Sequence, residues 1–179
     1  MHPLTEDANI VLIGMPGVGK RTVGVLLAKA ARRQFIDTDV LIQAREGRSL
    51  QEIIDTDGID QFCRMEQRHI LDLDCRGHVI ATGGSVVYSD AAMAHLKATG
   101  PVVHLDLPIE LLAKRIDNLD VRGVVMARDQ TLDDLFGRRD PLYRKWADIT
   151  IDGQARTQDQ IVAEILSRLQ PPGRGGRRP

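Results

Sequence analysis

Residues 10–22 read IVLIGMPGVGKRT, an apolar run followed by a glycine-rich turn and a lysine. The apolar run is typical of a buried strand, and residues 23–30 carry apolar side chains at helical spacing. A glycine-rich turn between a strand and a helix binds phosphate when its backbone N–H groups point into one concavity. We therefore expect residues 14–22, called the phosphate loop below, to form a phosphate site.

The phosphate loop has the residue types that this role requires. Glycines allow the backbone to bend, the helix N-terminus adds partial positive charge, and Lys20 adds a full positive charge. The usual pattern places a hydroxyl directly after the lysine, but this chain has Arg21 there and Thr22 one residue later. An ordinary strand-to-helix turn is the alternative. The candidates for phosphate binding are Gly14, Gly17, Val18, Gly19, Lys20, Arg21 and Thr22.

The composition is ordinary for a folded protein. The chain has 179 residues and a formal net charge of −1, so its length suits one domain and its charge gives no general attraction to nucleic acid or membranes. It has no apolar segment long enough to span a bilayer and no apolar signal region at its N-terminus. Cys63 and Cys75 lack metal-ligand spacing, and we expect a cytoplasmic protein.

Apolar runs alternate with helical patterns along the chain. This alternation predicts a three-layer α/β/α fold in which helices cover a parallel five-stranded sheet. We expect one domain over residues 1–170, with a lid at 117–129 and a disordered basic tail at 171–179. The expected strands are 10–13, 34–39, 78–82, 102–107 and 149–152. The expected helices follow at 23–30, 40–46, 49–58, 59–73, 89–96, 108–116, 131–146 and 157–169.

Polar clusters follow three of the predicted strands. Ligands on parallel sheets bind beyond the carboxyl ends of the strands. Those ends carry the phosphate loop, the acids Asp37 and Asp39, and the segment Gly83-Gly84-Ser85. The three clusters therefore predict a single site at one edge of the sheet.

In order and spacing these motifs resemble the shikimate kinase family over residues 9–169. The matching segments are residues 14–20 with Thr22, residues 35–39, Gly83-Gly84, Arg122, and residues 139–144. The resemblance implies a P-loop fold like that of nucleoside-monophosphate kinases. It also implies transfer of the γ-phosphate of ATP to a hydroxyl of shikimate, with Mg²⁺ as cofactor, by a monomeric enzyme.

The resemblance also implies a role for individual residues. Lys20 would neutralise charge on the transferring phosphoryl group. Asp39 would bind the acceptor hydroxyl and act as a base, and Asp37 would hold Mg²⁺ through water. Arg122 would close over the phosphates from the lid, and Arg139 would bind the substrate carboxylate. The remaining candidates are Arg115 and Arg156 for nucleotide and Arg64, Gly83, Gly84 and Ser85 for substrate.

Each of these roles has a structural alternative. Acids at the end of a strand are often helix caps, which applies to Asp37 and Asp39. Arg115 and Arg156 could be solvated charges, since arginine is mostly exposed. Arg139 lies in a charged run and could form a surface ion pair.

The chain departs from the family's pattern at three places. Arg21 replaces the serine or threonine that ligates Mg²⁺. Cys63 replaces the carboxylate-binding arginine of the Phe-Arg-x-x-Glu motif, and Arg64 is about 100° further around a helix. Ser85 replaces a third glycine, and residues 122–125 read RGVV where the family has Arg-Pro-Leu-Leu. A related kinase for another polyol or hydroxy acid, and a catalytically weak nucleotide-binding module, therefore remain alternatives.

Arg21 leaves two outcomes open. Its guanidinium could turn to solvent while Asp37, water and phosphate oxygens hold Mg²⁺ weakly. Alternatively it could lie on the phosphates and partly replace the charge of the metal. We favour the first outcome, because a long arginine at a helix start can usually reach solvent.

Overall fold

The computed structural model describes residues 5–116 and 131–169. The predicted lid at 117–129, Arg122 within it, and the predicted basic tail at 171–179 lie outside the described residues.

Five parallel strands form one sheet, as the alternating pattern predicted. Their order in the sheet is β2-β3-β1-β4-β5, so β1 occupies the centre. Ile10 of β1 pairs with Val79 of β3, and Val11 pairs with Val102 of β4. The strands are β1 (Ile10–Ile13), β2 (Gln34–Asp37), β3 (His78–Ala81), β4 (Val102–Asp106) and β5 (Ile149–Asp152).

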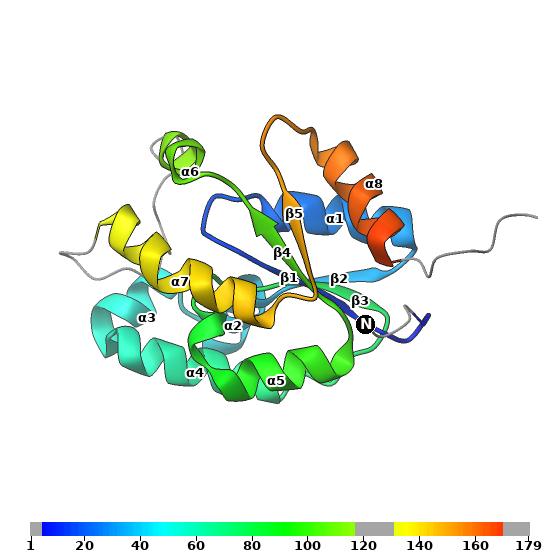
Figure 1. Ribbon diagram of the computed structural model, residues 1–179. Coiled ribbons are helices and arrows are strands. Elements are labelled where there is room, and N and C mark those ends of the chain that lie inside the picture. The colour runs from blue at the N-terminus through cyan, green and yellow to red at the C-terminus, as the bar shows by residue number, and fades with distance from the viewer. Residues whose placement is uncertain (1–4, 117–130, 170–179) are drawn as a thin grey trace, which may run out of the picture.

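Helices cover both faces of the sheet, which confirms the three-layer prediction. In Figure 1, α1 and α8 lie on one side of the strands, and α4, α5 and α7 lie on the other. The helices are α1 (Lys20–Ala31), α2 (Thr38–Glu46), α3 (Leu50–Asp57), α4 (Ile59–Leu71), α5 (Asp90–Thr99), α6 (Ile109–Ile116), α7 (Leu132–Trp146) and α8 (Gln158–Leu169), with a 3₁₀ turn η1 at Val86–Tyr88.

Helix caps explain most of the element boundaries. Ser49 and Glu52 form a capping box at the start of α3, and Ser89 caps α5. The prediction of a strand through residue 39 was wrong, because α2 already begins at Thr38. The carboxylate of Asp37 accepts the backbone N–H groups of Asp39 and Val40, which turns the chain into a helix two residues early.

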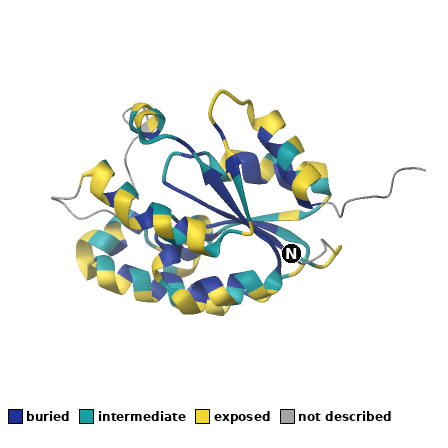
Figure 2. Cartoon of the chain, viewed as in Figure 1, coloured by how far each residue is buried: buried dark blue, intermediate teal, exposed yellow. Residues whose placement is uncertain are grey.

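The hydrophobic core lies on both sides of β1, whose four residues are fully buried. Figure 2 shows the buried strands between helices that expose their outer faces. A second cluster under α2, α3 and α4 includes Ile42, Ile53 and Phe62. This cluster fixes the orientation of α4, and therefore of the side chains that α4 directs toward the sheet edge. Within the described ranges, no helix combines the length and apolar character needed to cross a bilayer.

Candidate active site

The phosphate loop has the conformation that its glycines predicted. Gly14, Gly17 and Gly19 have φ values of 142°, 79° and 101°, which L-residues with side chains rarely adopt. At Gly14 a Cβ atom would also lie 2.5 Å from the carbonyl oxygen of Leu105. The loop therefore requires glycine at this position for both its dihedral angles and its close approach to β4.

Lys20 lies over the concave side of the phosphate loop. Its Nζ donates hydrogen bonds to the carbonyl oxygens of Gly14, at 2.7 Å, and Met15, at 3.0 Å. Burial lowers the pKa of Lys20 to about 8, and the negative charge of Asp39 partly opposes this shift. The ammonium therefore remains mostly charged at neutral pH and lies against the backbone of the phosphate loop.

Asp37 is the last residue of β2, and both of its carboxylate oxygens accept hydrogen bonds within the protein. Oδ1 accepts the N–H groups of Asp39 and Val40 at 3.0 and 3.1 Å. Oδ2 accepts a hydrogen bond of 2.6 Å from Nε of Arg21. The structure thus differs from both outcomes considered for Arg21, because the guanidinium pairs with the acid that was expected to hold the metal. Asp37 is also a helix cap, which was the structural alternative for this residue.

Asp39 lies in the first turn of α2 and faces Gly83, the residue that follows β3 and Thr82. A Cβ atom on Gly83 would lie 2.7 Å from Oδ1 of Asp39 and 2.4 Å from Oε1 of Glu66. Burial raises the pKa of Asp39 to about 6, with a further contribution from Asp37. Two carboxyl groups therefore converge on a glycine that leaves room for them.

Glu66 was named in the family's motif but was not among the predicted site residues. It is 2% exposed, and its Oε2 accepts a 2.7 Å hydrogen bond from the hydroxyl of Ser85. Oε1 has no hydrogen-bond partner among the described residues. Burial raises the pKa of Glu66 to about 7, and the bond from Ser85 opposes the shift. An acid on the same helical stripe as Phe62 and Met65 was the sequence signal for this residue.

Arg139 of α7 is 1% exposed, so it is not the surface charge of the structural alternative. Its Nε donates to the hydroxyl of Tyr88 at 3.1 Å, and its guanidinium carbon lies 5.2 Å from the centre of that ring. A Cβ atom on Gly84 would lie 2.8 Å from Nη1 of Arg139. Tyr143, one turn further along α7, donates to the carbonyl oxygen of Gly84 at 2.7 Å.

We call this group of side chains the buried cluster. It comprises Glu66, Ser85, Tyr88, Arg139 and Tyr143, from α4, the loop after β3, η1 and α7. A Cβ atom on Gly84 would lie 2.8 Å from Nη1 of Arg139 and 3.3 Å from Cδ of Pro16, which places the buried cluster beside the phosphate loop. The structure thus brings the three polar clusters together at one edge of the sheet, as the sequence predicted.

The substrate-side arginine of α4 is absent from this cluster. Arg64 is exposed, and its Nε donates to Gln61 at 3.0 Å. Cys63 is half-buried, and its thiol experiences the charges of Glu66 and Arg139. Burial raises the pKa of this thiol to about 11, so the thiol stays neutral. Cys63 packs against the second hydrophobic cluster, so neither it nor Arg64 supplies a positive charge to the buried cluster.

The two remaining nucleotide candidates have different surroundings. Nη1 of Arg115 donates to the carbonyl oxygen of Val18 at 3.3 Å, which places Arg115 beside the phosphate loop. Arg156 forms an ion pair with Glu164 of α8. Glu164 also pairs with Arg168 at 2.5 Å. The structure therefore places Arg115, but not Arg156, in contact with the phosphate loop.

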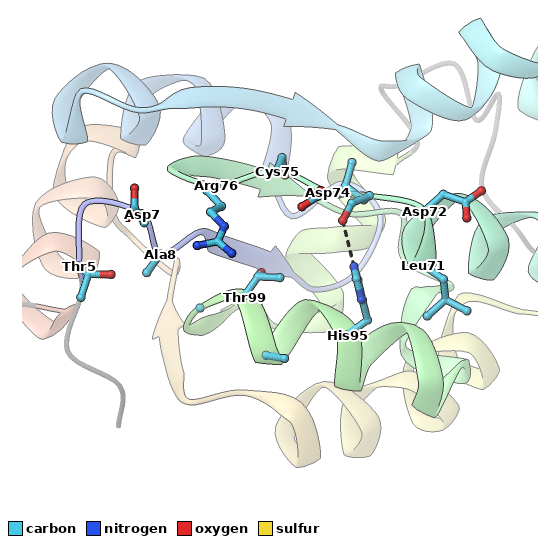
Figure 3. Close-up of a pocket in the computed structure, with 13 residues that line it drawn as sticks. Thr5, Asp7, Ala8, Leu71, Asp72, Asp74, Cys75, Arg76, His95 and Thr99 are labelled. Carbon is cyan, nitrogen blue, oxygen red and sulfur yellow. Dashed lines mark hydrogen bonds between the residues drawn. The ribbon is translucent and has the colours of Figure 1, made fainter.

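A separate hollow of about 560 Å³ lies at the amino ends of the strands (Figure 3). Its lining comes from the segments that precede or flank β1, β3 and β4, namely residues 5, 7, 8, 71–76, 95 and 98–100. The Nε2 atom of His95 lies 3.0 Å from the carbonyl oxygen of Leu73 there. Since ligands on parallel sheets bind at the carboxyl ends, the phosphate loop and the buried cluster are the candidate active site.

Comparison with known proteins shows the family of the chain. A family model described as shikimate kinase matches residues 16–170. The shikimate kinase of Pseudomonas entomophila is 40% identical over 165 residues, covering 90% of this chain and 96% of that protein. The structure of the shikimate kinase from Acinetobacter baumannii in complex with shikimate superposes with a TM-score of 0.84 at 33% identity, covering 90% of this chain and 92% of that one. The Aquifex aeolicus enzyme gives a TM-score of 0.77 at 32% identity, covering 90% and 95%.

Proposed function

The chain belongs to the shikimate kinase family and is an ATP-dependent small-molecule kinase, and we propose that it transfers the γ-phosphate of ATP to a hydroxyl of shikimate. The observation that carries this proposal is the position of the buried Arg139 beside Gly84, next to two carboxyl groups and Lys20. This edge of the sheet therefore offers Lys20 to the phosphates of ATP, Asp39 to the acceptor hydroxyl and Arg139 to the acceptor carboxylate.

The phosphate loop would bind the phosphates of ATP through its backbone N–H groups and Lys20. Phosphoryl transfer depends mainly on position and charge stabilisation. The acceptor oxygen attacks the γ-phosphorus while the bond from phosphorus to the β,γ-bridging oxygen breaks and ADP leaves. Asp39 would orient the acceptor hydroxyl and accept its proton. With a pKa of about 6, Asp39 is mostly ionised at neutral pH and can take that proton.

Shikimate kinases use ATP with Mg²⁺. The metal supplies positive charge to the phosphates when it is bound. Asp37 offers the carboxylate oxygens that Mg²⁺ prefers, so its chemistry fits the role. Its Oδ2, however, is paired with Arg21. Asp37 would therefore hold the metal only once that ion pair opens.

The carboxylate of the acceptor would be bound by Arg139. Its guanidinium is held by Tyr88 and lies against Gly84, so its planar donor groups are already oriented before substrate binds. Within residues 5–116 and 131–169 it is the only buried arginine. The neutral Cys63 replaces the family's second arginine, and we expect weaker carboxylate binding as a result.

An assay of ADP release tests this function. We expect turnover with ATP and shikimate, with the product identified by mass spectrometry as a monophosphate. The methyl ester of shikimate keeps the hydroxyls and loses the negative charge, so it is the matched control. Its kcat/KM should be lower by roughly tenfold or more, the scale of a charge-assisted hydrogen bond.

Two results would contradict the proposal. Turnover of an uncharged polyol or another hydroxy acid, with none of shikimate, would favour the related-kinase alternative that Cys63 suggests. Binding of ATP without turnover of any acceptor would favour a catalytically weak nucleotide-binding module.

Two further expectations accompany the function. We infer a cytoplasmic location, which the use of ATP and the free thiols of Cys63 and Cys75 support. A monomeric state remains a prediction, which light scattering of the purified chain would check.

A further inference from the structure

Arg21 and Asp37 form an ion pair that joins the phosphate loop to the end of β2. Arg21 lies in the first turn of α1, directly after Lys20, and Asp37 lies at the start of α2. Nε of Arg21 is 2.6 Å from Oδ2 of Asp37. The side chain of Arg21 is 63% exposed and that of Asp37 is 11% exposed. The guanidinium therefore covers a largely buried carboxylate from the solvent side.

This arrangement leaves no oxygen of Asp37 without a protein donor. The other oxygen, Oδ1, accepts two backbone N–H groups of α2. A divalent cation that approached Oδ2 would meet a positive guanidinium at close range, and the two charges repel each other. A metal and Arg21 therefore cannot both occupy Oδ2.

We propose that Arg21 is an intramolecular competitor of the divalent metal at Asp37. In the metal-free protein Arg21 neutralises Asp37, and the metal binds only after the guanidinium has left. This inference rests on the proposed function, since it concerns the metal that accompanies ATP. Its consequence is that Mg²⁺ strengthens nucleotide binding less in this chain than it would if Arg21 were absent.

The exposure of Arg21 makes such an exchange possible. An exposed ion pair is weak and screened by salt, and the long side chain can move without disturbing the core. Asp37, in contrast, is fixed by its two hydrogen bonds to the backbone of α2. The mobile partner of the pair is therefore the arginine, and the acid stays in place for the metal.

The test measures binding rather than turnover. ADP is titrated calorimetrically into the parent and into Arg21→Ala, in EDTA and at a series of Mg²⁺ concentrations. The ratio of the dissociation constants without and with Mg²⁺ gives the coupling between metal and nucleotide. We expect this ratio to be larger by roughly tenfold or more in Arg21→Ala, because removing one charge near a divalent ion has an effect of that order.

Three further variants separate the possible causes. Arg48→Ala removes the 2.7 Å ion pair with Asp57 on α3 and changes the net charge equally; it should leave the coupling ratio unchanged. Arg21→Ser should increase the ratio further, because its hydroxyl can ligate the metal. In the Asp37→Asn background, Arg21→Ala should give little increase, since the contested carboxylate is gone.

The outcomes distinguish this inference from the proposed function. If ADP binds neither protein in any condition, the proposed function falls. If ADP binds both with the same Mg²⁺ coupling, the function stands and the competition is wrong. Should Arg21→Ala fail to fold, Arg21→Met keeps the aliphatic part of the side chain and must show the same increase. An equal increase in Arg48→Ala would show a general charge effect and overturn the inference.

Discussion

The phosphate loop and the buried cluster face the same edge of the sheet but are built in different ways. The phosphate loop is one continuous segment, and its shape comes from three glycines with positive φ values. The buried cluster comes from three separate segments, α4, residues 83–88 and α7, and consists of side chains with little or no exposure, apart from Tyr88. One region binds through backbone geometry and the other through packed polar side chains.

This difference explains which departures from the family are tolerated. Arg21 changes the phosphate loop at an exposed side chain, so the backbone conformation is unaffected. Ser85 changes the buried cluster, and its hydroxyl immediately has a role, because it donates to the buried Glu66. A buried polar group needs such a partner. The buried cluster should therefore respond to small changes of shape, and the phosphate loop to changes of charge or backbone.

The largest effect should come from Lys20→Ala in the phosphate loop. Removal of the cation that meets the transferring phosphoryl group should lower kcat by roughly 10³-fold or more, at the upper end of losses for a preorganised electrostatic contact. The measurement is steady-state release of ADP, with circular dichroism to show that the fold is intact. Unchanged turnover in a folded variant would exclude this role for the phosphate loop.

Asp39→Asn tests whether Asp39, which lies between the phosphate loop and the buried cluster, acts as the base. Asparagine keeps the shape and loses the base, so we expect kcat to fall by roughly 10²-fold. In the parent, kcat/KM should fall as the pH drops through about 6, where Asp39 becomes protonated, and again above about 8, where Lys20 loses its proton. The acid side of this profile should be lost in the variant. A variant with normal kcat and reduced stability would leave Asp39 a structural residue only.

Arg139→Lys tests whether the buried cluster recognises the acceptor. Lysine keeps the charge and loses the planar fork of donors. The loss of a charge-assisted bond, about 1.5–3 kcal/mol, should raise KM for shikimate roughly 10- to 100-fold with little change in KM for ATP. Arg144→Lys is the matched control, since Arg144 lies on the same helix and pairs with Asp106 and Asp140. Equal effects of the two variants on KM would exclude specific recognition by Arg139.

The smallest effect concerns stability and comes from Glu66→Gln. The pKa of Glu66 is raised to about 7 in the folded protein, so the folded state retains a proton that the unfolded chain releases near its ordinary value. The contribution of Glu66 to stability is therefore present below about pH 4.5 and is lost as the pH rises toward and through 7. Glutamine cannot ionise, so the melting temperature of the variant relative to the parent should be higher at about pH 8 than at about pH 4. A difference that does not depend on pH would mean that Glu66 does not titrate in this range.

Interactions between residues close in the sequence were sufficient to predict the strands, most helices and the phosphate loop. The glycines and Lys20 lie within one short segment, so their spacing in the chain fixes their spacing in space. The capping box of Ser49 and Glu52 is equally local, because its partners are three positions apart. The strand prediction failed at Thr38 and Asp39, where the side chain of Asp37 acts as a helix cap and ends the strand.

The sequence by itself determined the alternating elements, the phosphate loop and the cation that it carries, because each depends on neighbours within a few residues. Only the tertiary structure decided which side chains share the site. Arg21 meets Asp37 across 16 positions, and Ser85 meets Glu66 across 19. Arg139 meets Tyr88 across 51 positions. Such contacts form where packed helices bring distant segments together, and burial then gives their charges and hydrogen bonds a strength that exposure to water would remove.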